Sequence, residues 1–370
     1  MAPDLSIPAD LLPADGRFGC GPSKVPAAAV AALAARGTDL LGTSHRQPAV
    51  RQQVARLRRG VADLFSIPDG HEVLIANGGA TAFWDMAAHG LIRRRSRHES
   101  FGEFSSKFAA AAARAPWLED PDLVEAPPGQ RPSVRATGEG VDVVGLTHNE
   151  TSTGVATEIL RPSGDALVLV DATSGAGGLP VDVAETDVYY FSPQKGLAAE
   201  GGLVIAIASP AALERIDEIA ASGRYVPAFL DLATVVDNSR KEQTYNTPSI
   251  ATIFLAAEQV DAMNAEGGLE TVAKRCAARA ESFYAWALER PWAAPFVTDP
   301  DARSAVVATI DLDGVSADDV NAVLRANGIV DTDSYRKLGR NQLRIGMFPA
   351  VDTDDLEAYR ACVDWIVERL

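Results

Sequence analysis

One lysine of this chain stands where an amine would be available for chemistry. In the stretch YYFSPQKGLAAEGG, residues 189–202, Lys195 lies between an aromatic, strand-like run and a glycine pair. The chain has only six lysines among its 34 basic residues. A primary amine can act as a nucleophile or a base, whereas a guanidinium group never loses its proton. Lys195 is therefore a candidate catalytic residue, and the plain alternative is a solvated lysine in a loop.

An aspartate is expected close to this lysine. Asp171 ends the apolar run ALVLVD, and Lys195 follows 24 residues later at the end of the next predicted strand. An amine and a carboxylate at neighbouring strand ends suit pyridoxal 5′-phosphate (PLP), because the amine bonds to the aldehyde and the carboxylate keeps the ring nitrogen protonated. An aspartate alone is more often a loop cap. The pair is more specific, and it makes Lys195 and Asp171 the predicted catalytic residues.

Two further features could hold such a cofactor. The sequence NGGAT, residues 77–81, puts small residues at a predicted helix start, where free backbone N–H groups can meet a phosphate. Glycine pairs also simply make turns, so this signal is weak alone. Phe104, in SFGEFSSKF, offers a ring that could stack on a flat cofactor, although an isolated aromatic residue usually belongs to the core.

The elements that must position these residues follow one pattern along the chain. Apolar runs end in short polar stretches, and several are followed by helix-like sequence; the predicted strands cover 72–76 and end near His148, at Asp171 and near Ser192. Short, continuous apolar strands separated by helices indicate a mostly parallel sheet covered on both faces, an α/β fold. Ligands of such sheets bind at the carboxyl ends of the strands. The four polar loops are therefore predicted to line one crevice.

The pattern changes after about residue 250. One long helix is predicted, broken near Gly267-Gly268, and the remaining sequence reads strand, helix, strand, helix. This arrangement is typical of a compact α+β unit. A length of 370 residues fits two domains.

Composition limits the possible partners and the compartment. A net charge of −16 argues against nucleic acid as a partner, and the basic run RRRSRH, residues 93–98, is predicted to be a solvated helix end. No signal peptide or membrane span is predicted, so a cytoplasmic protein is expected. Three scattered cysteines and the lack of a metal-binding cluster favour reduced thiols and no metal site.

Eight motifs, in order across nearly the whole chain, resemble those of the phosphoserine aminotransferase family, PLP enzymes of the aspartate aminotransferase fold type. They are FGCGPSKVP, GTSHRQP, NGGAT, HNETSTG, VDATS, FSPQKGL, YNTPSI and LRIGMF. The resemblance implies a large domain with a seven-stranded, mainly parallel sheet, residues 16–255, and a small α+β domain, residues 256–370, against which residues 1–15 pack. It also implies a homodimer with active sites at the subunit interface.

The same resemblance assigns cofactor contacts position by position. Lys195 would bond to PLP, Asp171 would contact its ring nitrogen, and Phe104 would stack on the ring where many family members have Trp. The remaining contacts would be Thr151 for the ring oxygen and, for the phosphate, Ala80, Thr81 and Gln194, with Asn246 and Thr247 from the second subunit.

Substrate contacts are implied in the same way. Arg344 would bind the α-carboxylate as a bidentate pair. Arg336, with His45 and Arg46 from the other subunit, would bind the phosphate of phosphoserine or the γ-carboxylate of glutamate. Where several family members have a histidine before the second phosphate-binding arginine, this chain has Tyr335, which can donate a hydrogen bond but brings no positive charge.

The implied reaction moves the amino group of L-glutamate to 3-phosphohydroxypyruvate, a step of serine biosynthesis, with phosphohydroxythreonine of pyridoxine biosynthesis as a possible second substrate. Rivals of the same fold are serine–glyoxylate and alanine–glyoxylate aminotransferases and cysteine desulfurases. A desulfurase needs a cysteine on a mobile loop, whereas Cys362 lies in a predicted helix. The rival from another class is a PLP-binding protein without catalysis.

Overall fold

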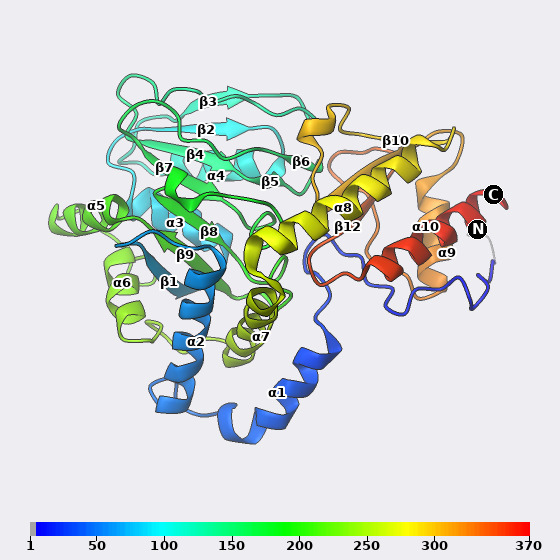
Figure 1. The fold of residues 1–370 in the computed structure, drawn as a ribbon. Helices are drawn as coiled ribbons and strands as arrows, with labels where there is room; N and C mark the ends of the chain where they lie inside the picture. Colours follow the sequence, from blue (N-terminus) through cyan, green and yellow to red (C-terminus); the bar gives the residue numbers. More distant parts are fainter. Residues whose placement is uncertain (1–4) are drawn as a thin grey trace.

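The computed structural model describes residues 5–370 and contains a central seven-stranded sheet (Figure 1). Five neighbouring strands run parallel, and β9 is antiparallel to both of its neighbours. The predicted α/β fold with a mainly parallel seven-stranded sheet is therefore confirmed. The strand order is β1 (Glu72–Asn77), β9 (Leu203–Ala208), β8 (Val188–Phe191), β7 (Leu167–Asp171), β4 (Val143–Thr147), β2 (Ser96–Ser100), β3 (Asp122–Glu125).

Helices cover both faces of this sheet, as Figure 1 shows. Alternate side chains of one strand point to opposite faces, so Ile75 of β1 belongs to one apolar cluster and Leu74 to another. The first cluster includes side chains of α2 (Pro48–Leu64) and α7 (Ile250–Glu266). The second includes α3 (Ala80–Gly90), α4 (Glu103–Ala113), α5 (Pro210–Ala221) and α6 (Leu232–Arg240).

A smaller antiparallel sheet forms a second core. Its strands are β10 (Ala293–Pro295), β11 (Val307–Leu312) and β12 (Gln342–Gly346), and it packs with α8 (Gly268–Leu288), α9 (Ala317–Ala326) and α10 (Thr353–Val367). Helix α8 links the two parts, because Val272 belongs to the first core and Phe283 to the second (Figure 1). The domain limits at 15/16 and 255/256 stay a prediction.

Near the amino terminus, Ile7 belongs to the second core and Leu5, Leu11 and Leu12 pack against it. Residues 1–4 of the predicted 1–15 segment lie outside the described residues. Helix α1 (Ala27–Leu40) follows at the periphery of the molecule (Figure 1). A two-stranded hairpin, β5 (Asn149–Glu150) and β6 (Val155–Ala156), follows β4. Two short 3-10 helices complete the elements, Val183–Glu185 and Pro300–Ala302.

Local sequence explains the break in the long helix and one wrong prediction. The break after α7 falls at Gly267 and Gly268, which have φ angles of +119° and +78° that favour glycine. The basic run at 93–98 is not a solvated helix end: Ser96 begins strand β2, and His98 within it is fully buried. Within residues 5–370, no helix is both long and apolar enough to cross a membrane.

Candidate active site

The predicted crevice exists as a cavity of 460 Å³ at the carboxyl ends of β4, β7 and β8. All four polar loops that follow the predicted strands contribute to its wall. Helices α3 and α4, the amino-terminal segment at residues 21–22 and the turn before β9 form the rest of the wall. The lining residues are Gly21, Pro22, Gly78, Gly79, Ala80, Thr81, Trp84, Phe104, Lys107, Thr147, Asn149, Thr151, Asp171, Thr173, Ser174, Ser192, Gln194, Lys195, Gly201 and Gly202.

Lys195 is buried in the wall of this cavity, with 7% of its surface exposed. Its Nζ donates to Thr151 Oγ1 at 3.0 Å and lies 5.1 Å from the centroid of the Phe104 ring. Burial lowers the pKa of the Lys195 amine to about 8, and the charge of Asp171 opposes that effect. Because much more of this amine is neutral at physiological pH than in a free lysine, it can act as a nucleophile or a base.

The Asp171 carboxylate is fixed by two N–H donors. Trp84 Nε1 donates to Oδ2 at 3.0 Å, and the backbone N–H of Thr173 donates to Oδ1 at 3.0 Å. Sequence reasoning missed Trp84. Its position four residues after Ala80 on α3 was the available signal, because residues i and i+4 share one face of a helix and Ala80 was already predicted to face the site.

The glycine turn that is predicted to cradle a phosphate lies at the amino end of α3. Gly79 is the N-cap and has no side chain, and Gly78 has a φ angle of +123° that a residue with a Cβ rarely adopts. The first N–H groups of the helix are left without partners within it, and the Thr81 side chain is exposed beside them. Gln194 Oε1 is buried and has no hydrogen-bond partner among residues 5–370.

A glycine from the amino-terminal part of the chain closes the cavity near the amine. A Cβ at Gly21 would lie 2.4 Å from Lys195 Cε, a contact too short for any other residue without a shift. The next segment is held in place because the Ser23 N–H donates to the Gln194 carbonyl at 2.7 Å. Sequence reasoning did not assign this contact, since only the fold brings residue 21 to residue 195.

The predicted substrate residues Arg344 and Arg336 lie at the side of the smaller sheet. Arg344 lines a cavity of 230 Å³ that shares Gly21 and Pro22 with the first cavity. Its Nη1 donates to the Thr151 carbonyl at 3.3 Å, and its guanidinium lies 5.3 Å from the Tyr335 ring centroid. Arg336 is exposed on the loop that precedes β12.

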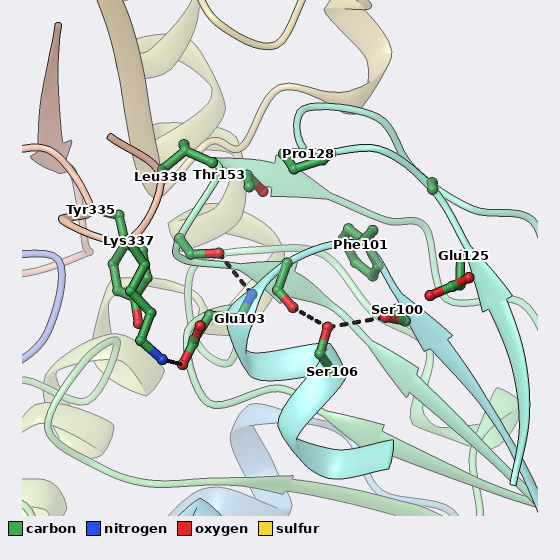
Figure 2. Close-up of a pocket in the computed structure, with 13 residues that line it drawn as sticks. Ser100, Phe101, Glu103, Ser106, Glu125, Pro128, Thr153, Tyr335, Lys337 and Leu338 are labelled. Carbon is green, nitrogen blue, oxygen red and sulfur yellow. Dashed lines mark hydrogen bonds and ion pairs between the residues drawn. The ribbon is translucent and has the colours of Figure 1, made fainter. Parts of the chain in front are cut away.

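That loop touches helix α4 through a charge cluster (Figure 2). Lys337 Nζ lies 2.5 Å from Glu103 Oε1, and Lys107 pairs with the same carboxylate at 3.0 Å. Tyr335 and Lys337 line a third cavity, of 300 Å³, together with Ser100 and other residues of the large sheet's edge. The loop that carries Arg336 therefore bridges the smaller sheet and the helix that carries Phe104.

The four residues predicted to act from a second subunit lie together on the surface. Thr247 Oγ1 is 3.2 Å from His45 Nδ1, and Asn246 Oδ1 accepts the Thr247 N–H at 2.8 Å. Arg46 Nη1 lies 3.4 Å from Gln243 Oε1. Burial lowers the pKa of His45, and the charge of Arg46 adds to the effect. None of the four is among the described residues that line the 460 Å³ cavity.

The residues of the 460 Å³ cavity fit PLP. The site pairs a buried amine of lowered pKa with a fixed carboxylate, an aromatic ring beside the amine, and a glycine-capped helix start. Unpaired buried oxygens of Gln194, Thr173 and Asn149, judged against residues 5–370, add hydrogen-bonding capacity to the wall. Such groups normally find a partner, so this wall is suited to a polar ligand.

Comparison with known proteins gives the family. The family model described as "Aminotransferase class-V" matches residues 18–332. A phosphoserine aminotransferase of Nocardioides sp. (strain ATCC BAA-499 / JS614) is 60% identical, and the match covers 100% of both chains. The chain therefore belongs to the class-V aminotransferases, which makes it a PLP-dependent transaminase. Within that class it is a member of the phosphoserine aminotransferase family.

Solved structures agree on the fold. That of a phosphoserine aminotransferase from Cytophaga hutchinsonii has a TM-score of 0.87 at 20% identity and covers 95% of this chain and 99% of its own. An alanine–glyoxylate aminotransferase from Nostoc sp. reaches 0.76 at 17% identity, with 99% and 97% covered. At these identities the likeness shows the fold alone, so the choice of substrate depends on the sequence relatives and on the site.

Proposed function

We propose that this chain binds PLP and transfers the amino group of L-glutamate to 3-phosphohydroxypyruvate, giving O-phospho-L-serine and 2-oxoglutarate for serine biosynthesis. The observation that carries this proposal is the 60% identity to a phosphoserine aminotransferase over the whole of both chains. A cytoplasmic location and a role with phosphohydroxythreonine in pyridoxine biosynthesis belong to the same proposal.

When bound, PLP supplies an aldehyde that bonds to amines and a ring that accepts the electrons released as the substrate's Cα loses a proton. Lys195 would hold it covalently, and the neutral Nζ would later move the proton from the substrate's Cα to the cofactor's C4′ carbon. The lowered pKa of about 8 supports this role. Asp171 would keep a positive charge on the ring nitrogen, Thr151 would bond the ring oxygen, and Phe104 would stack on the ring.

The phosphate of PLP would bind at the start of α3, to Ala80 and Thr81, with Gln194 beside them. Backbone N–H groups at a helix start favour an anion through both hydrogen bonds and the helix dipole. In a homodimer, Asn246 and Thr247 of the partner subunit would complete this site.

Substrate would be bound through its two anionic ends. Arg344 would pair with the α-carboxylate, and Arg336 would meet the distal phosphate or carboxylate together with His45 and Arg46 of the partner subunit. A net charge of −16 repels anions in general, so a local cluster of cations is needed to bind them.

The homodimer is supported by apolar side chains exposed near the loops expected to reach across. Val30 of α1 is 50% exposed, Leu41 is 42% exposed, and Tyr245 is 47% exposed beside Asn246. Burying these side chains against a second copy would remove apolar surface from water.

The direct test supplies the enzyme with glutamate and either 3-phosphohydroxypyruvate or glyoxylate, and measures the amino acid formed by chromatography. We expect phosphoserine from the first acceptor, and at least about a hundredfold lower kcat/KM with glyoxylate, which offers no distal anion. Equal or faster turnover of glyoxylate would contradict the proposal and favour a glyoxylate aminotransferase.

A further inference from the structure

Glu150 carries a carboxylate that is fully enclosed by the protein, with 0% of its surface exposed. Its contacts are N–H and O–H donors. Oε2 accepts from the backbone N–H groups of Phe104 at 3.0 Å and Ser105 at 2.9 Å, and the Ser105 hydroxyl lies 3.0 Å away. Oε1 accepts from the N–H of Ser152 at 3.2 Å and from its hydroxyl at 2.7 Å. Burying a charge is costly, so this arrangement needs an explanation.

These contacts place Glu150 at the amino end of α4. The first N–H groups of a helix have no partner within it and are usually bonded by the N-cap side chain. Here the N-cap is Gly102, which has no side chain to offer. A Cβ at Gly102 would lie 2.3 Å from Glu150 Cγ. The glycine thus leaves room for a carboxylate from a different element to cap the helix.

The cap connects two groups that face Lys195. Phe104 is the second residue of α4, and its ring centroid lies 5.1 Å from Lys195 Nζ. Thr151 directly follows Glu150 and accepts a hydrogen bond from the same Nζ at 3.0 Å. The carboxylate therefore ties the helix that carries the ring to the loop that carries the hydroxyl, and it sets the spacing between them across the cavity.

We propose that Glu150 is a positioning residue. By capping α4 from a different element, it holds the Phe104 ring in the position in which the ring stacks on the cofactor. The inference rests on the proposed PLP site. Glu150 is predicted to act through Phe104, so removing the ring should remove most of its effect on cofactor binding.

The test is a double-mutant cycle on the full-length protein with PLP as the probe. Cofactor is removed from four proteins: the unchanged protein, Glu150→Gln, Phe104→Ala and the double variant. The PLP dissociation constant is then measured by absorbance. The circular dichroism of the bound PLP is measured too, per mole of PLP bound. Glutamine keeps one acceptor oxygen and places an NH2 group against N–H donors, so we expect affinity to fall by at least about tenfold. The double variant should bind within about twofold of Phe104→Ala alone.

Gly102→Ala gives a second route to the same displacement, because it pushes the carboxylate away without changing its charge. Gly102→Ala should weaken the binding of PLP and alter the circular dichroism of bound PLP, as Glu150→Gln does. If Glu150→Gln fails to fold, Gly102→Ala replaces it in the double-mutant cycle. Glu103→Gln is the matched control: this carboxylate lies at the same helix end but points to Lys337 (Figure 2), and its loss should change PLP affinity by less than about twofold.

Two results would overturn the inference. One is a double variant whose loss of PLP affinity equals the product of the losses in the two single variants, because the two residues would then act independently. The other is a Glu150→Gln protein that melts at a lower temperature yet binds PLP with unchanged affinity and unchanged circular dichroism, which is the signature of a purely structural role. Failure of the unchanged protein to bind PLP at all would instead refute the cofactor proposal, and this inference with it.

Discussion

Replacing Asp171 by Asn in the cofactor-free protein should make the Lys195 amine more reactive, although it should harm the holoenzyme. Burial lowers the pKa of Lys195 from 10.5 to about 8, and the charge of Asp171 is the largest effect in the opposite direction. An amide in place of this carboxylate removes the charge that favours the protonated amine. The pKa of Lys195 should therefore fall further.

The structure bounds the size of this effect. With a pKa of about 8, about 9% of the amine is neutral near pH 7, against about 0.03% for a lysine of ordinary pKa. The buried amine should thus react about 300-fold faster near pH 7 than its ordinary pKa would allow. Asp171→Asn can raise the rate by at most about elevenfold more, because the amine is then wholly neutral.

Reductive methylation of the cofactor-free protein, with formaldehyde as a small reagent, measures this reactivity. Mass spectrometry of the peptide containing Lys195 gives its rate between about pH 6 and pH 11. Glu150→Gln should also speed the labelling, but less strongly. The charge of Glu150 raises the pKa of Lys195 by less than the charge of Asp171 does. Half-maximal labelling above about pH 10, or slower labelling in Asp171→Asn, would refute the reasoning.

Three further predictions concern the holoenzyme. Borohydride reduction followed by peptide mapping should put the pyridoxyl label on Lys195, and a label on Lys107 or Lys241 would refute that assignment. Asp171→Asn should retain some PLP but lose at least about a hundredfold in kcat, because a neutral amide cannot hold the ring's positive charge; turnover near normal would exclude Asp171 as the ring partner. Mixing inactive Lys195→Ala with inactive Arg46→Ala should restore activity, since one site of the hybrid dimer is intact; no recovery after proven subunit exchange would mean that Arg46 does not act across the interface.

The ends of the central strands could be predicted because they follow from local sequence. The runs before Asp171 and Ser192 are continuous and apolar, as strands buried on both faces must be, and each stops at a polar loop. Parallel topology then brings these loops to one edge of the sheet, which is why Lys195 and Asp171 share a cavity.

Strand β2 was missed for a physical reason. Its sequence, SRHES, looks exposed, yet Ser96, His98 and Glu99 are buried. Some of their polar groups are paired inside the protein: His98 Nε2 lies 2.8 Å from Ser96 Oγ, and Glu99 Oε2 accepts the Thr147 N–H at 3.2 Å. His98 Nδ1 is buried without a partner among residues 5–370. Burial raises the pKa of Glu99 to about 8. A pattern based on apolar residues does not detect such a strand.

Contacts between distant parts of the chain were also beyond sequence reasoning. Trp84 donates to Asp171 across 87 residues, and Glu150 caps the helix of Phe104 across 46. Each depends on how helices pack on the sheet, and neither leaves a periodic signal. The motif residues could be assigned because they resemble a family, whereas their supporting contacts required the structure.

Single-turnover spectroscopy tests the central claim most directly, namely that the pocket requires a distal anion. Phosphoserine, glutamate, serine and alanine are each mixed with the PLP form at fixed pH and salt, and conversion to the pyridoxamine form is followed by absorbance. Phosphoserine and glutamate should convert the cofactor, with serine and alanine poorer by at least about a hundredfold in kcat/KM, because they leave the distal cations unpaired. If serine or alanine matched phosphoserine, the account would be contradicted.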